Sequence, residues 1–301
     1  MLAIIAPGQG AQTPGMLTPW LEISDCAESI SRWSEVIGRD LVALGTTADA
    51  DEIRDTANAQ PLIVATGLIS ANLLGVSAPI ISGHSVGEIT AAAVAKVISE
   101  FDAMRFVNDR ANAMAKAASL EKTGMSAVLG GDREEVLDAI MKLGLVAAND
   151  NGAGQIVAAG LISELSLFAD NLPVGARIRP LAVAGAFHTR YMQSAQEVLA
   201  KSAATISPSD PTGSIISNRD GFAVVDGEEV LERIISQVAS PVRWDLCMKS
   251  LQELGVTGVI ELAPAGTLVG LLKRAAPEIE TFAFKSPADL AAASEFAEKH
   301  K

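Results

Sequence analysis

The sequence predicts an α/β fold with a mainly parallel sheet, interrupted by a smaller ferredoxin-like unit. Two observations lead to this fold class. Short apolar runs, typical of strands buried on both faces, alternate along the chain with segments of helical periodicity. Between about Thr123 and Ala184 the order changes to strand, helix, strand, strand, helix, strand, which is the order of a ferredoxin-like unit.

The parallel sheet is expected to take its strands from five short apolar runs, each bounded by turn-forming residues or a helical segment. They are Leu2–Ala6, Pro79–Ser82, Ser214–Ser217, Val256–Leu262 and Thr281–Lys285. Helical periodicity predicts helices over about Ala59–Leu74, Val86–Val97 and Phe101–Ala118.

The stretch between Asp55 and Glu88 contains no charged residue, so a membrane span has to be considered. Proline and glycine residues interrupt it, and no run of about twenty uninterrupted apolar residues remains. A buried helix followed by a buried strand is the better interpretation. The apolar N-terminus is short and has no basic region before it, so no secretory signal is expected.

A strand, a sharp turn and a helix meet at Gly83-His84-Ser85-Val86-Gly87, which fits the nucleophile-elbow pattern G-x-S-x-G. The glycines allow a tight turn, and the serine hydroxyl is expected to stand at the end of the strand, above the positive end of the helix. Ser85 is therefore the candidate nucleophile. The alternative is a simple strand-to-helix turn with no chemistry.

A serine nucleophile needs a base, and the chain has only three histidines. His300 is the penultimate residue, and His84 adjoins the serine, so its side chain should project elsewhere. His188 remains, in a turn of small residues after a strand-like run. Because no acidic residue is near it in sequence, a Ser-His dyad with a backbone carbonyl orienting the ring is favoured over a full triad.

Arg110 lies on the apolar face of its predicted helix, between Val107 and Met114. A guanidinium on a buried face needs an anionic partner, and its fork matches a carboxylate. That partner is either an acidic side chain elsewhere in the chain or the carboxylate of a substrate.

The first predicted strand ends in Pro7-Gly8-Gln9-Gly10, a turn that leaves backbone N–H groups free. The amide of Gln9, together with that of Val86, is a candidate oxyanion hole. A nucleotide-binding loop is disfavoured, because the residues after Gly10 lack both the glycine spacing and the Lys-Ser/Thr ending of such loops.

These motifs, in this order along nearly the whole chain, resemble the malonyl-CoA:acyl carrier protein transacylases, in their stand-alone actinobacterial form. The resemblance also rests on the segments Gln60-Pro61-Leu62, Asn151-Gly152-Ala153-Gly154-Gln155, Gly185-Ala186-Phe187-His188, Pro241-Val242-Arg243-Trp244 and Pro264-Ala265-Gly266-Thr267-Leu268. It implies a hydrolase-like large subdomain and a ping-pong transfer of malonyl from malonyl-CoA, through a seryl ester, to the phosphopantetheine thiol of acyl carrier protein.

The resemblance assigns roles position by position. Ser85 would be acylated, His188 would be general base and then general acid, and Gln9 and Val86 would supply the oxyanion amides. Arg110 would bind the malonyl carboxylate, in a pocket shared with Gln60, Phe187 and Asn151. Phe187 would leave no room for a branched acyl group, and the backbone carbonyl of Arg243 would orient the histidine.

The small unit lies between Ser85 and His188 in sequence, so it is predicted to be an insertion with the site in the cleft beside it. Its predicted strands are Met125–Leu129, Leu145–Asn149, Gln155–Ala159 and Arg177–Ala184, and its helices Arg133–Leu143 and Leu161–Asn171. The large subdomain would comprise residues 1–122 and 187–301, and the small one residues 123–186.

Composition limits the partners. The chain has 301 residues, 49% of them hydrophobic, and a net charge of −13, which argues against nucleic acid. Cys26 and Cys247 are far apart in sequence, which suits a reducing cytoplasm and offers no metal site. The family resemblance implies substrates but no bound cofactor. A monomer is expected.

An acyl carrier protein is itself acidic, so its docking requires local basic groups. The candidates are Lys116, Arg177, Arg190, Lys273 and Arg274, although the last two also suit an ordinary helix end. Two other classes remain as alternatives: a serine thioesterase or esterase that hydrolyses acyl-CoA, and a non-catalytic module that binds carrier protein.

Overall fold

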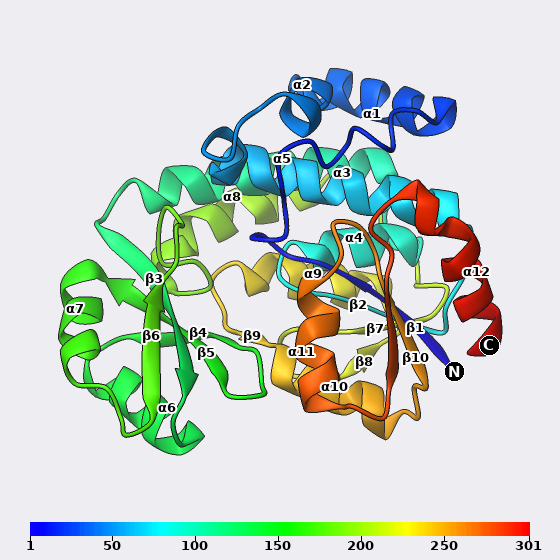
Figure 1. The fold of residues 1–301 in the computed structure, drawn as a ribbon. Helices are drawn as coiled ribbons and strands as arrows, with labels where there is room; N and C mark the ends of the chain where they lie inside the picture. The colour runs from blue at the N-terminus through cyan, green and yellow to red at the C-terminus, as the bar shows by residue number, and fades with distance from the viewer.

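The computed structural model describes residues 1–301, which form two sheets with helices packed around them (Figure 1). The strands are β1 (Leu2–Ala6), β2 (Ile80–Gly83), β3 (Thr123–Gly130), β4 (Val146–Asp150), β5 (Gln155–Leu161), β6 (Ala176–Pro180), β7 (Ser214–Ile216), β8 (Ala223–Val224), β9 (Val242–Arg243), β10 (Gly258–Glu261) and β11 (Glu280–Ala283). The helices are α1 (Ser24–Ile37), α2 (Leu41–Thr46), α3 (Thr56–Leu74), α4 (Gly87–Val94), α5 (Glu100–Ala118), α6 (Arg133–Lys142), α7 (Ile162–Asp170), α8 (Gln193–Ala203), α9 (Gly227–Gln237), α10 (Trp244–Glu253), α11 (Thr267–Ala275) and α12 (Leu290–Lys299), with 3₁₀ turns at Glu52–Arg54 (η1), Arg190–Met192 (η2) and Pro287–Asp289 (η3).

The larger sheet has the strand order β11-β10-β1-β2-β7-β8 and is parallel except for β8, which pairs antiparallel with β7. The carboxyl ends of β1 and β2 lie side by side, because Ala6 is opposite Gly83. The turn after β1 and the turn after β2 therefore meet at one edge of the sheet, where open α/β sheets bind their ligands.

Both faces of this sheet are covered, and β1 shows how the sequence achieves this. Leu2 and Ile4 pack into one core with residues of α3, α4 and α5, whereas Ala3 and Ile5 pack into a second core with residues of α10 and α11. Successive side chains of a strand point to opposite faces, so a fully apolar run is what a central strand needs.

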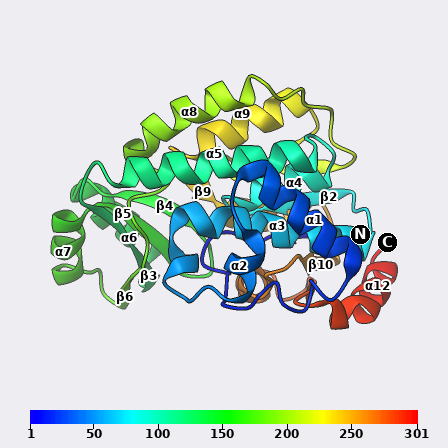
Figure 2. The ribbon, with the colours of Figure 1, turned by 90° about the horizontal axis from the view of Figure 1, so that it is seen from above.

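Helix α3 lies within the larger core, packed against α4 and α5 (Figure 2). By length and composition it is the one helix that qualifies as a candidate membrane span, and 72% of its apolar window is buried inside the fold. The predicted buried helix is thus confirmed, beginning three residues earlier than expected, at Thr56.

The smaller sheet has the order β6-β3-β5-β4-β9, and its first four strands pair antiparallel. Helices α6 and α7 cover one face through a core that includes Val136, Ile140 and Phe168. The order of β3, α6, β4, β5, α7 and β6 is the ferredoxin-like order, so the predicted fold class is confirmed. Figure 1 shows this unit beside the larger sheet.

One predicted strand is shorter than expected, and two short strands were missed. The strand predicted to run from Arg177 to Ala184 ends at Pro180, because after the bond from Leu181 N–H to Met125 the chain leaves the sheet. Strands β8 and β9 were not predicted, since two residues are too few to show alternation. Strand β9 pairs parallel with β4, so a segment from outside residues 123–186 completes the smaller sheet.

Candidate active site

Ser85 stands in the sharp turn between β2 and α4 with φ +56°, a backbone conformation that is costly for a residue with a Cβ. Two close approaches require the flanking glycines. A Cβ on Gly83 would lie 2.1 Å from the backbone carbon of Gly87, and one on Gly87 would lie 2.3 Å from the carbonyl oxygen of Ala6. The geometry is that of the predicted nucleophile elbow.

The structure brings His188 to Ser85, across 103 residues of sequence. The Ser85 Oγ is 2.8 Å from His188 Nε2, and the other ring nitrogen, Nδ1, is 3.0 Å from the backbone oxygen of Gln237. Since a carbonyl only accepts, Nδ1 carries the proton, and Nε2 is left to accept the serine proton. This arrangement is a dyad oriented by a backbone carbonyl.

The environment keeps this imidazole neutral. Burial, followed by the positive charge of Arg110, lowers the pKa of His188 to about 3, although the hydrogen bond to Gln237 opposes the shift. His188 is therefore unprotonated at neutral pH, which is the form that a general base needs.

Arg110 is 1% exposed, and no carboxylate lies within salt-bridge distance of its guanidinium, although the charge of Glu88 acts on it from farther away. It donates to three neutral oxygens: Gln60 Oε1 at 2.6 Å, Gln237 Oε1 at 3.2 Å and Ser85 Oγ at 3.3 Å. Its Nε is buried without any acceptor. Burial lowers the pKa of Arg110 only to about 10, so the group is a buried cation beside the nucleophile.

A cavity of about 260 Å³ opens at these side chains and lies between the two sheets. Its polar wall includes Ser85, His188 and Arg110, and the face of the smaller sheet opposite α6 and α7 contributes Met125, Ala127 and Val157 to its apolar wall. The apolar lining comprises Met114, Met125, Ala127, Val157, Leu181, Val183, Phe187, Leu268 and Leu271.

The predicted pocket residues all line this cavity. Phe187 is 5% exposed and precedes His188, and Gln60 reaches it from α3 with its oxygen on Arg110. Asn151 follows β4; its Oδ1 is 3.0 Å from His84 Nε2, and its Nδ2 donates to Gln155 Oε1 at 2.9 Å. Asn151 therefore joins the smaller sheet to the turn that carries the serine.

The turn after β1 lies against the elbow. A Cβ on Gly8 would be 2.7 Å from the backbone oxygen of His84, and the next residue, Gln9, lines the cavity. The backbone N–H groups of Gln9 and Val86 donate no hydrogen bond within the protein. No group of three or more His, Cys, Asp or Glu side chains is placed to hold a metal ion.

The sequence of the chain is similar to a known family of proteins. A family model described as an acyl transferase domain matches residues 4–291. The malonyl CoA-acyl carrier protein transacylase of Mycobacterium tuberculosis is 49% identical over 296 residues, covering 96% of this chain and 98% of the relative. The chain belongs to this family. The expected likeness to the actinobacterial form is confirmed, since the transacylase of Haemophilus influenzae is 31% identical, covering 98% of each chain.

Solved structures of transacylases share the fold. The crystal structure of the enzyme from Mycobacterium tuberculosis superposes with a TM-score of 0.94 at 48% identity, covering 97% of this chain and 99% of the other. A malonyl transacylase solved in complex with its type II polyketide acyl carrier protein gives a TM-score of 0.93 at 28% identity, covering 98% and 99%.

One role expected from the family resemblance, that of the Arg243 carbonyl, is wrong. The carbonyl that accepts His188 Nδ1–H belongs to Gln237, not to Arg243. Gln237 is the last residue of α9, where carbonyls lack intrahelical partners and the helix dipole is negative. Its oxygen accepts the ring N–H and also the backbone N–H of Ser240 at 3.1 Å. Arg243 instead lies in β9, and its guanidinium binds Asp245 through two hydrogen bonds.

The candidate docking residues lie at three places on the surface. Lys116, in the last turn of α5, and Arg190, in the adjacent 3₁₀ turn η2, are both exposed, and Arg190 stacks on the ring of Tyr191. Lys273 and Arg274 are exposed in the last turn of α11, whose first residues line the cavity. Arg177, in β6, is also exposed.

Sequence reasoning missed three residues that surround the dyad. Besides Gln237, these are Glu88, in the first turn of α4, and Asn218, just after β7. Both are buried, and burial raises the pKa of Glu88 to about 7. A carboxylate within an otherwise apolar helical segment was the one signal available for Glu88, and Asn218 was marked only by its place after a predicted strand.

Proposed function

We propose that this chain transfers the malonyl group from malonyl-CoA to the phosphopantetheine thiol of acyl carrier protein, supplying extender units for fatty acid synthesis. The observation that carries this proposal is Arg110: a buried cation with no carboxylate bonded to its guanidinium, 3.3 Å from the Ser85 oxygen. Glu88 acts on it only from a longer distance. A malonyl thioester has a carboxylate two carbon–carbon bonds from its reactive carbonyl, so one small acyl group reaches both Ser85 and Arg110.

In the first half-reaction, His188 Nε2 takes the proton of Ser85 as Oγ attacks the thioester carbonyl. The N–H groups of Gln9 and Val86 would stabilise the resulting oxyanion. The C–S bond then breaks, and His188 gives its proton to the departing sulfur of coenzyme A. Malonyl remains as an ester of Ser85. The carrier thiol reverses these steps: it gives its proton to His188, attacks the ester, and Ser85 regains a proton.

The pocket residues hold the acyl group during this exchange. Gln60 and the side chain of Gln237 fix the plane of the Arg110 guanidinium through their oxygens. We assign Phe187 to the wall that limits branching and Asn151 to the side of the cleft formed by the smaller sheet. A carboxylate pinned by Arg110 keeps the ester in line for the thiol, which favours transfer over hydrolysis.

The remaining expectations complete the proposal. Malonyl-CoA and the acyl carrier protein are substrates, no bound cofactor is needed, and the site of action is the cytoplasm. Residues 1–122 and 187–301 would act as the large subdomain, and residues 123–186 as an inserted small one. The Nδ1–H acceptor in this mechanism is the Gln237 carbonyl.

The first test is intact-protein mass spectrometry after brief mixing with malonyl-CoA, with Ser85→Ala in parallel. We expect one malonyl adduct on the wild type and none on the variant, and transfer of the adduct when phosphopantetheinylated acyl carrier protein is added. Free malonate and coenzyme A without an adduct that moves to the carrier would establish a thioesterase instead. An unreactive wild type would contradict the proposal.

Carrier docking is proposed at Lys116, Arg190, Lys273 and Arg274, because an acidic carrier needs cationic partners on a chain whose net charge is −13. Reversal of these charges to glutamate should raise the KM for carrier protein and leave the KM for malonyl-CoA unchanged. Lys142→Glu, on exposed α6, is the matched control. Equal effects on both substrates would exclude docking at these positions.

A further inference from the structure

Asn218 lies beneath the nucleophile, and every polar group it has is bonded. It is 0% exposed. Its side-chain Oδ1 accepts the backbone N–H of Ser85 at 2.7 Å, and its Nδ2 donates to the carbonyl of Gly83 at 2.7 Å. Its own N–H donates to Glu88 Oε1 at 2.8 Å, and its carbonyl accepts from Arg243 N–H at 2.8 Å.

The two side-chain bonds extend the parallel sheet beyond the end of β7. Ser82 is opposite Ile216 in the β2–β7 ladder, so the same register would place residue 218 opposite His84. In a parallel ladder, a residue opposite His84 would donate its N–H to the carbonyl of Gly83, and its carbonyl would accept the N–H of Ser85. The carboxamide of Asn218 makes this pair of bonds in place of a peptide group.

This rung coincides with the strained residue of the elbow. The φ of +56° at Ser85 persists only where the surroundings hold it, because such a conformation is costly for a residue with a Cβ. Since Asn218 binds the backbone on both sides of His84, it fixes the plane in which Ser85 leaves the strand. Asn218 also accepts the N–H of Ser85, so that N–H is not available to an oxyanion, whereas the N–H of Val86 is.

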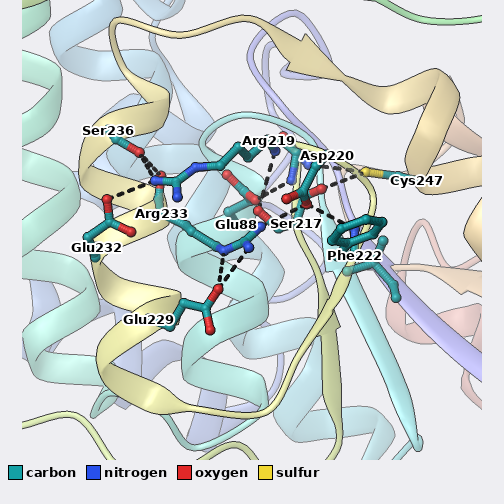
Figure 3. A network of polar contacts seen from close by, with 12 residues as sticks. Glu88, Ser217, Arg219, Asp220, Phe222, Glu229, Glu232, Arg233, Ser236 and Cys247 are labelled. Carbon is teal, nitrogen blue, oxygen red and sulfur yellow. Dashed lines mark hydrogen bonds and ion pairs between the residues drawn. The ribbon is translucent and has the colours of Figure 1, made fainter.

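The carboxyl group of Glu88 holds Asn218 in place and makes no other hydrogen bond. Its Oε2 is buried without a partner, while its Oε1 accepts only the Asn218 N–H. Figure 3 shows Glu88 among Arg219, Arg233 and their acidic partners. Those arginines bind other carboxylates: Arg233 pairs with Asp220 and Glu229, and Arg219 pairs with Glu232.

We propose that Asn218 is a positioning residue for acyl transfer, which sets the direction of the Ser85 hydroxyl by acting as a side-chain rung of the parallel sheet. Of the residues close in size, only an amide offers the donor and the acceptor together. Leucine offers neither, and an ionised aspartate offers an acceptor alone. This inference rests on the proposed function, because it concerns the acylation of Ser85.

The test is the rate constant for malonyl-Ser85 formation, measured by rapid quench and mass spectrometry, for wild type, Asn218→Leu and Asn218→Asp. A displacement of the nucleophile of about 1 Å lowers the rate about 10²-fold. We expect that loss in both variants at pH 8, with one malonyl still bound per chain at the end point and the KM for malonyl-CoA changed less than about threefold, since Arg110 and its partners are untouched.

The Asn218→Asp variant adds a pH readout that a merely structural role would not produce. When its new carboxyl group is protonated, it regains a donor for the Gly83 carbonyl, so the rate of this variant relative to wild type should rise as the pH falls from 8 to 6. Glu88 and Cys247 are the titratable groups beside position 218, and Arg110, Arg219 and Arg233 are the cations that act on Glu88. Because a new carboxyl group at position 218 would shift the titration of Glu88, the ratio is measured in a Glu88→Gln background, which keeps an acceptor for the N–H of residue 218.

Ser82→Ala is the matched control, because it removes a buried hydrogen bond to Ile216 between the same two strands but leaves the elbow contacts intact. It should keep the wild-type acylation rate. Folded variants at position 218 that acylate as fast as the wild type would overturn the inference, as would a lower end-point stoichiometry at an unchanged rate constant. If Asn218→Leu does not fold, the pH ratio of the aspartate variant decides alone. A wild type that takes up no malonyl contradicts the proposed function instead.

Discussion

Replacing Arg110 with alanine is expected to remove the preference for malonyl-CoA over acetyl-CoA. The guanidinium is buried, and its contacts are to Gln60, Gln237 and Ser85, all neutral. A carboxylate bound by its fork would make two charge-assisted hydrogen bonds, each contributing about 1.5–3 kcal/mol. Their loss corresponds to a decrease of about 10²–10⁴-fold in kcat/KM for malonyl-CoA, because about 1.4 kcal/mol is a factor of ten.

Acetyl-CoA has no carboxylate, so its kcat/KM should fall by less than about tenfold, or rise as the unpaired buried charge is removed. The assay is the kcat/KM ratio of the two thioesters, measured by coenzyme A release. Arg110→Lys keeps the charge without the fork and should lie between wild type and alanine. Arg105→Ala is the control on the same helix, since the Arg105 side chain is 64% exposed. An unchanged malonyl-to-acetyl ratio in a folded Arg110→Ala variant would remove Arg110 from the acyl site.

Three further outcomes are expected. Gly83→Ala should lower the free energy of unfolding by more than about 2 kcal/mol, because its Cβ would overlap the backbone of Gly87, whereas Gly270→Ala, with open space in helix α11, should be neutral or stabilising in urea denaturation. The imidazole of His188 should stay neutral from pH 8 to pH 4.5 by NMR, since burial and Arg110 lower its pKa to about 3; a midpoint near 6.5, assigned with His188→Gln, would refute this. Because burial raises the pKa of Glu88 from 4.5 to about 7, the folded state binds more protons than the unfolded state between these values, and this contribution to stability falls as pH rises. The stability of Glu88→Gln relative to wild type should therefore increase by about 3 kcal/mol from pH 4.5 to pH 7.5, and a pH-independent difference would contradict the shift.

The sequence was sufficient to predict the residues whose signals are local. The elbow is a run of five residues in which Gly83 and Gly87 must lack a Cβ, so the pattern by itself marks Ser85 as the candidate nucleophile. Arg110 broke the apolar pattern of its own helix. His188 followed by elimination, because a chain with three histidines offers few bases.

The fold class also followed from local patterns, since alternation of apolar runs and helical segments is written along the chain. The short strands β8 and β9 did not, because two residues carry no period and pair only where the rest of the fold brings them. The pairing of β9 with β4, which attaches the smaller sheet to the segment after α9, is therefore a property of the tertiary structure alone.

Only the tertiary structure identified the groups that hold the dyad. Every residue has a carbonyl, so no sequence pattern distinguishes the oxygen of Gln237 from that of Arg243; the end of α9 decides, because its last carbonyls have no intrahelical partner. Asn218 and Ser85 are separated by 133 residues and meet because β7 lies beside β2. The sequence by itself singled out the candidate side chains for the chemistry. The packing of distant segments decided which polar groups lie against them, since a hydrogen bond depends on positions in space that no single stretch of chain specifies.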